Sequence, residues 1–179
     1  MIILASKSPR RQELLKLITE DFVVKSASVD EALPSGIEPC EAVLYLSRIK
    51  AEPFESENDI VIGADTVVAL GNKILGKPEN DEDAARMLKM LSGKEHNVFT
   101  GVTVIKSGKS RSFYEKTAVK FFDLTEDEIN AYVATGECSD KAGAYGIQGK
   151  GSLLVEKITG DYFNVVGLPV ARLYRELKF

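Results

Sequence analysis

Residues 6–11, with the sequence SKSPRR, place two hydroxyl groups, a lysine and two arginines between an apolar run and a predicted helix. Ser8 stands at the N-cap position and Pro9 at the first helical position, where its missing N–H costs nothing. Unpaired backbone N–H groups and the positive end of the helix dipole favour an anion here. Cations oppose that dipole by about 0.3–1 kcal/mol each, and a bound anion reverses the penalty. The segment therefore predicts an anion site; the alternative is a capped helix with solvated arginines.

Asp65 follows an apolar run, residues 60–64, that is typical of a buried strand. Ligands of α/β proteins gather beyond the ends of such strands. A carboxylate placed there can hold a metal ion, orient a water molecule or accept its proton. The alternative is an aspartate that closes a turn.

Residues 75–78, LGKP, contain part of a phosphate-loop pattern. Gly71 and Gly76-Lys77 match most of GxxxxGK, but position 78 is proline where that loop needs Ser or Thr. The glycines also border a predicted hairpin rather than a turn from strand to helix. We reject an ATP-binding loop on these grounds and keep Lys77 as a point charge that could contact phosphate.

Residues 141–151 contain four glycines within a stretch of nine residues. Glycine lets the backbone approach a ligand closely, and the amide of Gln148 can pair with both a donor and an acceptor. This segment could read a nucleotide base. The alternative is a flexible connection between strands.

Other catalytic residue types are scarce. His96 is the only histidine, so a histidine-rich metal site is excluded, and its place at the start of a β-rich run favours a structural role. Cys40 and Cys138 lie far apart without a metal-binding spacing, which favours two buried thiols over a disulfide. The remaining metal ligands are carboxylates, which suit Mg²⁺ or Mn²⁺.

Composition is that of a globular protein. Of the 179 residues, 44% are hydrophobic and 28% are charged, which allows a buried core and argues against disorder. The formal net charge of −4 argues against a general nucleic-acid-binding protein. The N-terminal apolar stretch is too short for a signal peptide, and no apolar run reaches the roughly 18–20 residues that cross a bilayer. We expect one cytoplasmic domain over residues 1–179, long enough for two lobes, with no membrane partner.

A predicted mixture of strands and helices positions these segments. Strands are expected at residues 2–5, 22–26, 60–65, 67–70, 73–75, 97–106 and 111–122, and after the glycine-rich stretch. Helices are expected to begin at Pro9, near Pro39, after Asp81 as the cap, with a capping box of Thr125 and Glu128, and at Pro169. Hairpin turns at Gly71-Asn72 and at residues 107–109 predict a mixed α/β fold whose sheet is not purely parallel.

Taken together, these segments resemble the Maf family, which is named for inhibition of septum formation and is related in fold to the Ham1-type inosine triphosphatases. The matching motifs run nearly end to end and in order. They are LASxSPRRxxLL at residues 4–15, Asp30-Glu31, Lys50-Ala51, IGADTVV at 62–68, LGKP at 75–78, LSG at 91–93, DKAGAYGIQG at 140–149, Gly160-Asp161-Tyr162 and VGLP at 166–169.

The resemblance implies an elongated mixed α/β fold with two lobes around a central cleft. It also implies an enzyme that hydrolyses a nucleoside triphosphate to the monophosphate and pyrophosphate, with Mg²⁺, Mn²⁺ or Co²⁺ as cofactor. Asp65 would accept the proton of the attacking water, and Glu31 would bind the metal together with Asp65. The implied substrate-binding residues are Ser8, Arg10, Arg11, Lys50, Thr66, Lys77 and Gln148.

In the resemblance, base preference depends on Arg10, Thr66 and Gln148, and this combination looks like the dTTP/UTP branch. A 7-methyl-GTP branch typically carries tryptophan at the position of Arg10. CTP and modified pyrimidine nucleotides stay open as substrates. The alternative function is a regulator of cell division that binds a triphosphate without turnover, and relatives suggest a homodimer.

Overall fold

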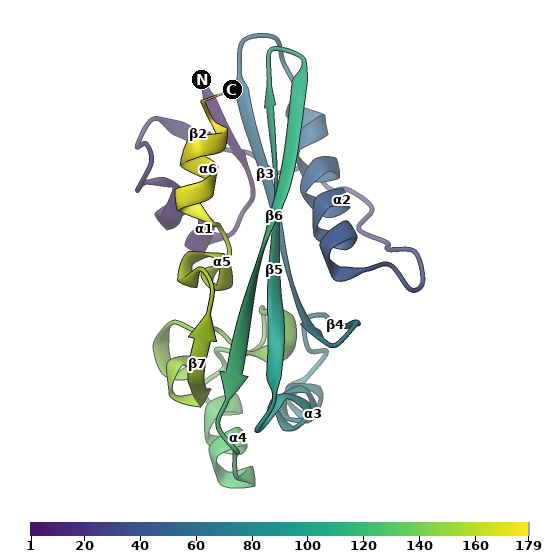
Figure 1. The fold of residues 1–179 in the computed structure, drawn as a ribbon, viewed down its shortest axis with the longest axis vertical. Coiled ribbons are helices and arrows are strands. Elements are labelled where there is room, and N and C mark those ends of the chain that lie inside the picture. The colour runs from purple at the N-terminus through teal and green to yellow at the C-terminus, as the bar shows by residue number, and fades with distance from the viewer. Residues whose placement is uncertain (179) are drawn as a thin grey trace. The chain divides into compact units, whose positions relative to one another are not determined.

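The computed structural model describes residues 1–178 and contains a seven-stranded mixed sheet (Figure 1). The strand order is β2-β1-β3-β5-β6-β7, and β4 pairs with β3. The strands are β1 (Ile2–Ala5), β2 (Phe22–Val24), β3 (Ile60–Leu70), β4 (Lys73–Leu75), β5 (Glu95–Lys106), β6 (Lys109–Phe121) and β7 (Val155–Thr159). The α-helices are α1 (Pro9–Leu15), α2 (Pro39–Ala51), α3 (Asp81–Leu91), α4 (Glu126–Val133), α5 (Tyr162–Val166) and α6 (Val170–Glu176). The 3-10 helices are η1 (Glu52–Phe54), η2 (Ala142–Ala144) and η3 (Gly149–Leu154).

The chain divides into two compact units. Unit 1 comprises Met1–Thr66, Phe99–Glu115 and the residues from Gly167 onward, and unit 2 comprises Val67–Val98 and Lys116–Val166. Strands β3, β5 and β6 contribute residues to both units, so the boundary falls within continuous strands. Among the residues that the structure describes, no helix has the length and apolarity needed to cross a membrane.

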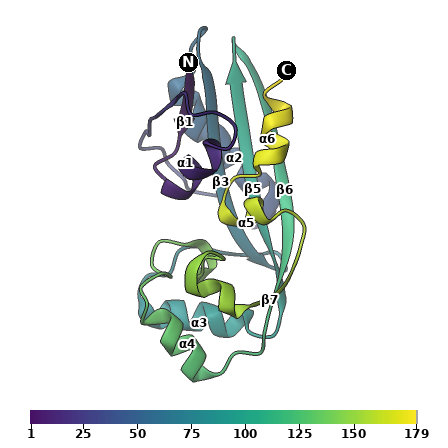
Figure 2. The same cartoon turned by 90° about the vertical axis from the view of Figure 1, so that its left-hand side faces the viewer.

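In unit 1, α2 covers one face of the sheet, and α1 and α6 cover the other (Figures 1 and 2). β1 pairs in parallel with β2 and β3, with Ile3 opposite Val23 on one side and Val61 on the other. Parallel neighbours need crossover connections, which α1 and α2 supply. A buried cluster joins β1, β3, β5 and the end of α2; its members are Ile3, Ala5, Ala51, Val61 and Ile105.

In unit 2, a separate core lies between the sheet and helices α3 and α4. β3 and β4 form the hairpin predicted around Gly71, and β6 pairs antiparallel with β7. Val68 of β3, Leu88 of α3 and Phe121 of β6 are all at most 4% exposed, and Ile129 brings α4 into the same cluster. This core anchors the hairpin and the helices of the unit.

The mixed α/β fold and the capping box of α4 are confirmed. Thr125 Oγ1 accepts from the backbone N–H of Glu128, and the Glu128 carboxylate accepts from the N–H of Thr125. At α3, however, Asn80 is the cap and not Asp81. The Asn80 side chain accepts from the backbone N–H of Asp83, because Asn80 has the extended backbone of an N-cap and Asp81 is already helical.

Other element boundaries also differ from the sequence-based expectation. β3 runs from Ile60 to Leu70, so Asp65 lies inside one continuous strand rather than at the end of a shorter one, because the second half of the strand pairs with β4. β2 ends at Val24, and Pro169 is the N-cap of α6 rather than its first residue. The short helix α5 was not predicted.

Candidate active site

Two glycines let α2 lie directly on the sheet of unit 1. A Cβ atom on Gly63 of β3 would stand 2.2 Å from the carbonyl oxygen of Ser47, and one on Gly101 of β5 would meet the α2 backbone equally closely. Real Cβ atoms essentially never approach within 3.0 Å of such an atom, so a larger residue would displace the helix. The close contact holds the last turn of α2, which carries Lys50, against the part of β3 that carries Asp65.

The ammonium group of Lys50 joins two carboxylates. Its Nζ lies 2.5 Å from Oδ1 of Asp65 and 3.1 Å from Oε2 of Glu31. The side chain of Asp65 is 12% exposed, whereas that of Glu31, on the loop between β2 and α2, is 54% exposed. The structure therefore brings three predicted site residues together from a strand, a helix and a loop, with one carboxylate sheltered and the other open to solvent.

The guanidinium group of Arg11 makes three hydrogen bonds within unit 1. Nε donates to the carbonyl oxygen of Gly167 at 2.9 Å, Nη1 to Oγ of Ser6 at 3.2 Å, and Nη2 to Oγ1 of Thr66 at 3.0 Å. Thr66 Oγ1 also lies 2.8 Å from Oγ1 of Thr100. Arg11 thus fixes the orientation of Thr66, a role that the sequence analysis did not assign to it. Thr100 was not identified either, since a threonine within a β-rich run carries no signal of its own.

Arg11 also adds positive charge beside the Lys50 cluster. Burial lowers the pKa of Arg11, and the carboxylate of Asp65 opposes that shift. Neighbouring Arg10 lowers the pKa of Arg11 further, whereas Glu31 raises it. An arginine nevertheless stays charged in a protein. The group as a whole suits an anionic ligand that brings further negative charge.

Ser8 and Arg10 lie at the start of α1 and are both half-buried. Ser8 occupies the predicted N-cap position, but its side chain makes no capping hydrogen bond. Its backbone N–H donates instead to Oγ of Ser6 at 3.3 Å. The start of α1 is thereby tied to the hydrogen-bond network of Arg11, and the Ser8 hydroxyl is not used for capping.

Lys77 and Gln148 belong to unit 2, and both side chains are exposed. Lys77 follows β4, where the carbonyl oxygen of Gly76 accepts from the N–H of Gly143 at 3.0 Å. Gln148 is the N-cap residue of η3. The backbone bond ties the segment that carries Lys77 to the glycine-rich segment that carries Gln148.

Two side chains hold the glycine-rich segment, which is therefore not a loose connection. The carboxylate of Glu137 accepts from the backbone N–H of Lys150 at 3.2 Å and from that of Gly151 at 3.3 Å. The hydroxyl of Tyr132 accepts from the N–H of Gly146 at 3.1 Å. Glu137 and Tyr132 were not predicted from the sequence, because no local spacing connects them with the segment that they hold.

The expectation of a structural role for His96 is confirmed. The side chain is fully buried, Nε2 lies 2.6 Å from the hydroxyl of Tyr145, and the ring packs edge-on against Phe121. Burial lowers the pKa of His96 to about 4, so the ring is neutral at pH 7. Cys40 and Cys138 are both free, as expected, but only Cys138 is buried.

The carboxylates of Glu31 and Asp65 fit a Mg²⁺-type ion in number and in chemistry. Within residues 1–178, no group of three or more His, Cys, Asp and Glu side chains could hold a metal ion. Mg²⁺ is usually bound through one or two carboxylates, with substrate phosphates and water completing its shell. Two carboxylates on one lysine therefore suit an ion that arrives with a triphosphate better than a permanent structural ion.

This chain is similar in sequence to known proteins over nearly its whole length. The model of the family described as "Maf-like protein" matches residues 1–179. Two proteins named dTTP/UTP pyrophosphatase, from Bacillus cereus (strain B4264) and Bacillus mycoides (strain KBAB4), are 52% and 51% identical over 179 residues, which cover 99% of this chain and 94% of each relative. A solved structure described as the Staphylococcus aureus Ham1 protein has a TM-score of 0.48 and 19% identity, over 68% of this chain and 72% of that one.

Proposed function

We propose that this chain, which belongs to the Maf-like protein family, is a nucleoside triphosphate pyrophosphatase that releases pyrophosphate from dTTP and UTP. Relatives with this activity in their names share about half of its residues over nearly its whole length. The non-catalytic regulator has no comparable support.

The observation that carries the proposal is the ion-paired cluster of Asp65, Lys50 and Glu31. A protein that only binds a triphosphate has no need for a sheltered carboxylate that can take a proton from water. The ammonium group of Lys50 adds positive charge directly beside this carboxylate. The cluster thus combines a base with positive charge, which hydrolysis of an anionic substrate requires.

In the proposed reaction, a water molecule attacks the α-phosphorus of the triphosphate. The new bond forms between the water oxygen and this phosphorus, and the bond to the oxygen that bridges to the β-phosphate breaks. The electron pair leaves on pyrophosphate, and Asp65 accepts the water proton. Because Lys50 binds Oδ1 of Asp65, we assign the proton to Oδ2.

Glu31 and Asp65 would hold a divalent metal ion, which we propose to be Mg²⁺, Mn²⁺ or Co²⁺. Such an ion supplies charge neutralisation for the phosphate groups when it is bound. Lys50 and Arg11 contribute fixed positive charge on the protein side. Lys77 and Ser8 are our further candidates for phosphate contacts.

Base selection is assigned to Arg10, Thr66 and Gln148. Arg11 donates a hydrogen bond to the hydroxyl of Thr66. Glu137 accepts a hydrogen bond from the backbone of the segment that carries Gln148. Hydrogen bonds therefore restrict two of these three positions. A polar group that is held in place favours discrimination between bases, because binding of the wrong base leaves that group without a hydrogen-bond partner and is weaker for that reason. We further propose that the enzyme acts in the cytoplasm as a homodimer.

The test is release of pyrophosphate from a panel of nucleoside triphosphates, with Mg²⁺, Mn²⁺, Co²⁺ or no metal. We expect metal-dependent formation of monophosphate and pyrophosphate, fastest with dTTP and UTP. Asp65→Asn should lower kcat by about 10²- to 10⁴-fold, the usual contribution of a general base, while the affinity for dTTP persists. Asp21→Asn, at an exposed aspartate of the same unit, is the matched control and should keep full activity.

The same panel of nucleotides distinguishes the proposed activity from the alternative functions. Binding of nucleotides without turnover would support the regulator and would contradict our proposal. Release of the γ-phosphate as inorganic phosphate would indicate a different hydrolase. Full activity in Asp65→Asn would show that another group accepts the proton.

A further inference from the structure

Thr66 of β3 and Thr100 of β5 form a pair of hydroxyl groups beside Arg11. Oγ1 of Thr66 accepts a hydrogen bond from Nη2 of Arg11 at 3.0 Å and lies 2.8 Å from Oγ1 of Thr100. Strands β3 and β5 are neighbours in the sheet, so the backbone of both strands fixes this pair. Thr100 is fully buried, whereas Thr66 is half-buried, so of the two only Thr66 has surface that a ligand can reach.

The directions of the hydrogen bonds at Thr66 follow from the chemistry of a hydroxyl group. A hydroxyl donates one hydrogen bond and offers two lone pairs, whereas a guanidinium group only donates. Arg11 therefore occupies one lone pair of Thr66. A hydroxyl that accepts a hydrogen bond is polarised and becomes a stronger donor, which favours donation from Thr66 to Thr100. One lone pair of Thr66 then remains, and toward a ligand Thr66 can only accept.

We propose that Thr100 is a positioning residue for base selection, because it accepts the hydrogen bond of the Thr66 hydroxyl and leaves Thr66 as an acceptor for the N3–H group of uracil or thymine. This inference rests on the proposed function, in which Thr66 takes part in base selection. Uracil and thymine carry a hydrogen atom on N3, whereas N3 of cytosine is an acceptor. Two acceptors that face each other form no hydrogen bond, so this arrangement disfavours cytosine.

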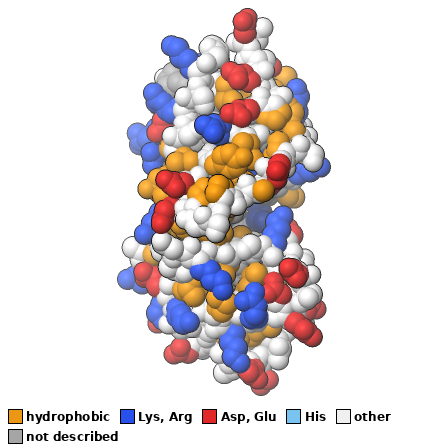
Figure 3. Space-filling model, turned by 90° about the vertical axis from the view of Figure 1, so that its right-hand side faces the viewer, with side chains coloured by type: hydrophobic (Ala, Val, Ile, Leu, Met, Phe, Trp, Pro, Cys, Tyr) orange, Lys and Arg blue, Asp and Glu red, His pale blue; other side chains and the backbone are white. Residues whose placement is uncertain are grey.

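Positive charge alone does not distinguish these bases. UTP and CTP carry the same ribose and the same triphosphate, so Lys50 and Arg11 attract them equally. Lysine and arginine side chains also stand at many places on the surface (Figure 3), and charge there attracts any triphosphate alike. Discrimination between UTP and CTP therefore requires a group with a defined hydrogen-bond direction, which Thr100 gives to Thr66.

The test compares Thr100→Val with the wild type in steady-state release of pyrophosphate from UTP and from CTP. Valine keeps nearly the shape of threonine but has no hydroxyl, so the O–H group of Thr66 loses its acceptor and can turn to donate to N3 of cytosine. The value of kcat/KM for CTP should rise, and the ratio of kcat/KM for UTP to that for CTP should fall about tenfold or more. Thr100→Ser keeps a hydroxyl at this position and should retain the wild-type ratio.

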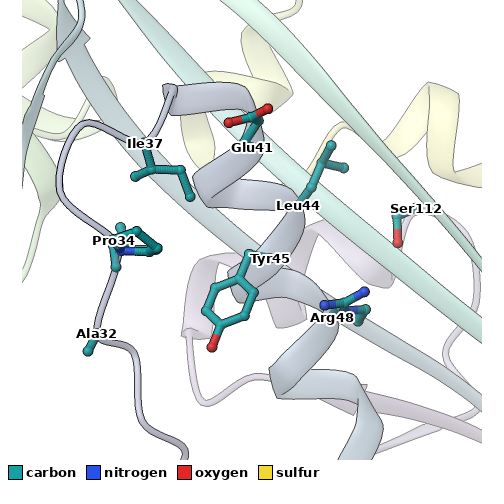
Figure 4. Close-up of a pocket in the computed structure, with 9 residues that line it drawn as sticks. Ala32, Pro34, Ile37, Glu41, Leu44, Tyr45, Arg48 and Ser112 are labelled. Carbon is teal, nitrogen blue, oxygen red and sulfur yellow. The ribbon is translucent and has the colours of Figure 1, made fainter.

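Thr103→Val is the matched control, because Thr103 is a fully buried threonine of the same strand. Its Oγ1 atom lies 2.8 Å from Oγ of Ser47 and 2.8 Å from Oγ of Ser112. Ser112 lines a pocket of about 690 Å³ beside α2, and no residue that lines this pocket is assigned to the substrate (Figure 4). Thr103→Val should lose stability in urea as Thr100→Val does. Any effect on α2 through Ser47 should change both substrates alike, so the ratio should stay at the wild-type value.

Binding provides a second measurement, which does not depend on turnover. The dissociation constants of UTP and CTP, measured by isothermal titration calorimetry without divalent metal, should favour UTP in the wild type and lose that preference in Thr100→Val. Absence of hydrolysis in a protein that shows both results would contradict the proposed function but would support this inference.

Two outcomes would overturn the inference even in an active enzyme. One is equal affinity of the wild type for UTP and CTP. The other is a preference for UTP that Thr100→Val leaves intact, including an equal loss of activity toward both nucleotides, which would assign Thr100 a structural role only.

Discussion

The Nζ atom of Lys50 lies 2.5 Å from Oδ1 of Asp65, and this ion pair joins the last turn of α2 to the middle of β3. The same Nζ atom also binds the carboxylate of Glu31 on the preceding loop. Because one ammonium group separates two carboxylates, its removal leaves like charges facing each other. The effect of that removal can be measured without changing the proposed base.

We expect Lys50→Met to lower kcat for dTTP by about 10²- to 10³-fold, the loss typical for one electrostatic group at a reacting centre. Methionine keeps much of the length of the lysine side chain but carries no charge. The measurement is steady-state release of pyrophosphate. Lys16→Met is the control, because Lys16 is exposed and pairs with an exposed carboxylate, Glu13. Retention of full activity in Lys50→Met would show that this cation has no part in the reaction.

The contact between α2 and β3 leads to a prediction about Gly63. Gly63→Ala should lower the free energy of unfolding by about 1–3 kcal/mol, the usual effect of overpacking, because its Cβ would collide with the backbone at Ser47. Activity should fall as well, since the helix carries Lys50. Urea unfolding measures the first effect. Gly76→Ala is the control for stability, because a Cβ on Gly76 meets nothing within 4 Å; equal losses in both variants would contradict the prediction.

Local patterns in the sequence predicted those features of the fold that depend on residues close together in the chain. The capping box of Thr125 and Glu128 spans one helical turn, and its spacing predicts its hydrogen bonds. The N-cap of α3 was placed one residue late, because Asn80 and Asp81 are both good caps and only the backbone conformation distinguishes them. Asp65 was placed at the end of a strand, since aspartate is uncommon inside strands.

The candidate site could be predicted only in part, because its contacts join segments that are distant in the sequence. Asp65, Glu31 and Lys50 were identified through their motifs, but their contacts join three segments distant in sequence and no spacing reveals them. Glu137 was missed because its partners are backbone N–H groups, which every residue except proline offers. The internal hydrogen bonds of Arg11 are likewise tertiary, so its role in holding Thr66 required the structure.

Glu137 gives a prediction about base selection. Glu137→Gln should remove one of the two hydrogen bonds to the backbone and weaken the other, because Oε1 accepts from Lys150 and Oε2 from Gly151, whereas glutamine keeps one neutral acceptor oxygen. We expect the ratio of kcat/KM between dTTP and CTP to fall several-fold, with a smaller change in kcat for dTTP. Glu57→Gln, on an exposed loop of unit 1, is the control. An unchanged ratio would mean that the segment around Gln148 takes no part in selection.

A substitution at Arg11 can separate the contribution of its positive charge to stability from that of its hydrogen bonds. Arg11→Lys keeps the positive charge but cannot reproduce bonds to Ser6, Thr66 and Gly167 at once. The free energy of unfolding should fall by about 1–3 kcal/mol, because buried acceptors lose their donor. Urea unfolding checks this, with Arg86→Lys at an exposed arginine as control. A variant as stable as the wild type would show that the charge alone matters.

The buried side chain of His96 should make the stability of the protein depend on pH. Its pKa is lowered to about 4 in the folded state by burial, against an ordinary value of about 6.5, so the unfolded chain binds the proton more readily. The stability that the neutral ring provides is therefore complete above pH 6.5 and is lost as the pH falls toward 4. Between pH 7 and pH 5 this single group should remove about 2 kcal/mol of the free energy of unfolding. Urea unfolding at both values should show that loss in the wild type but not in His96→Gln, which keeps a polar partner for Tyr145. An equal loss in both proteins would assign the pH dependence to other groups.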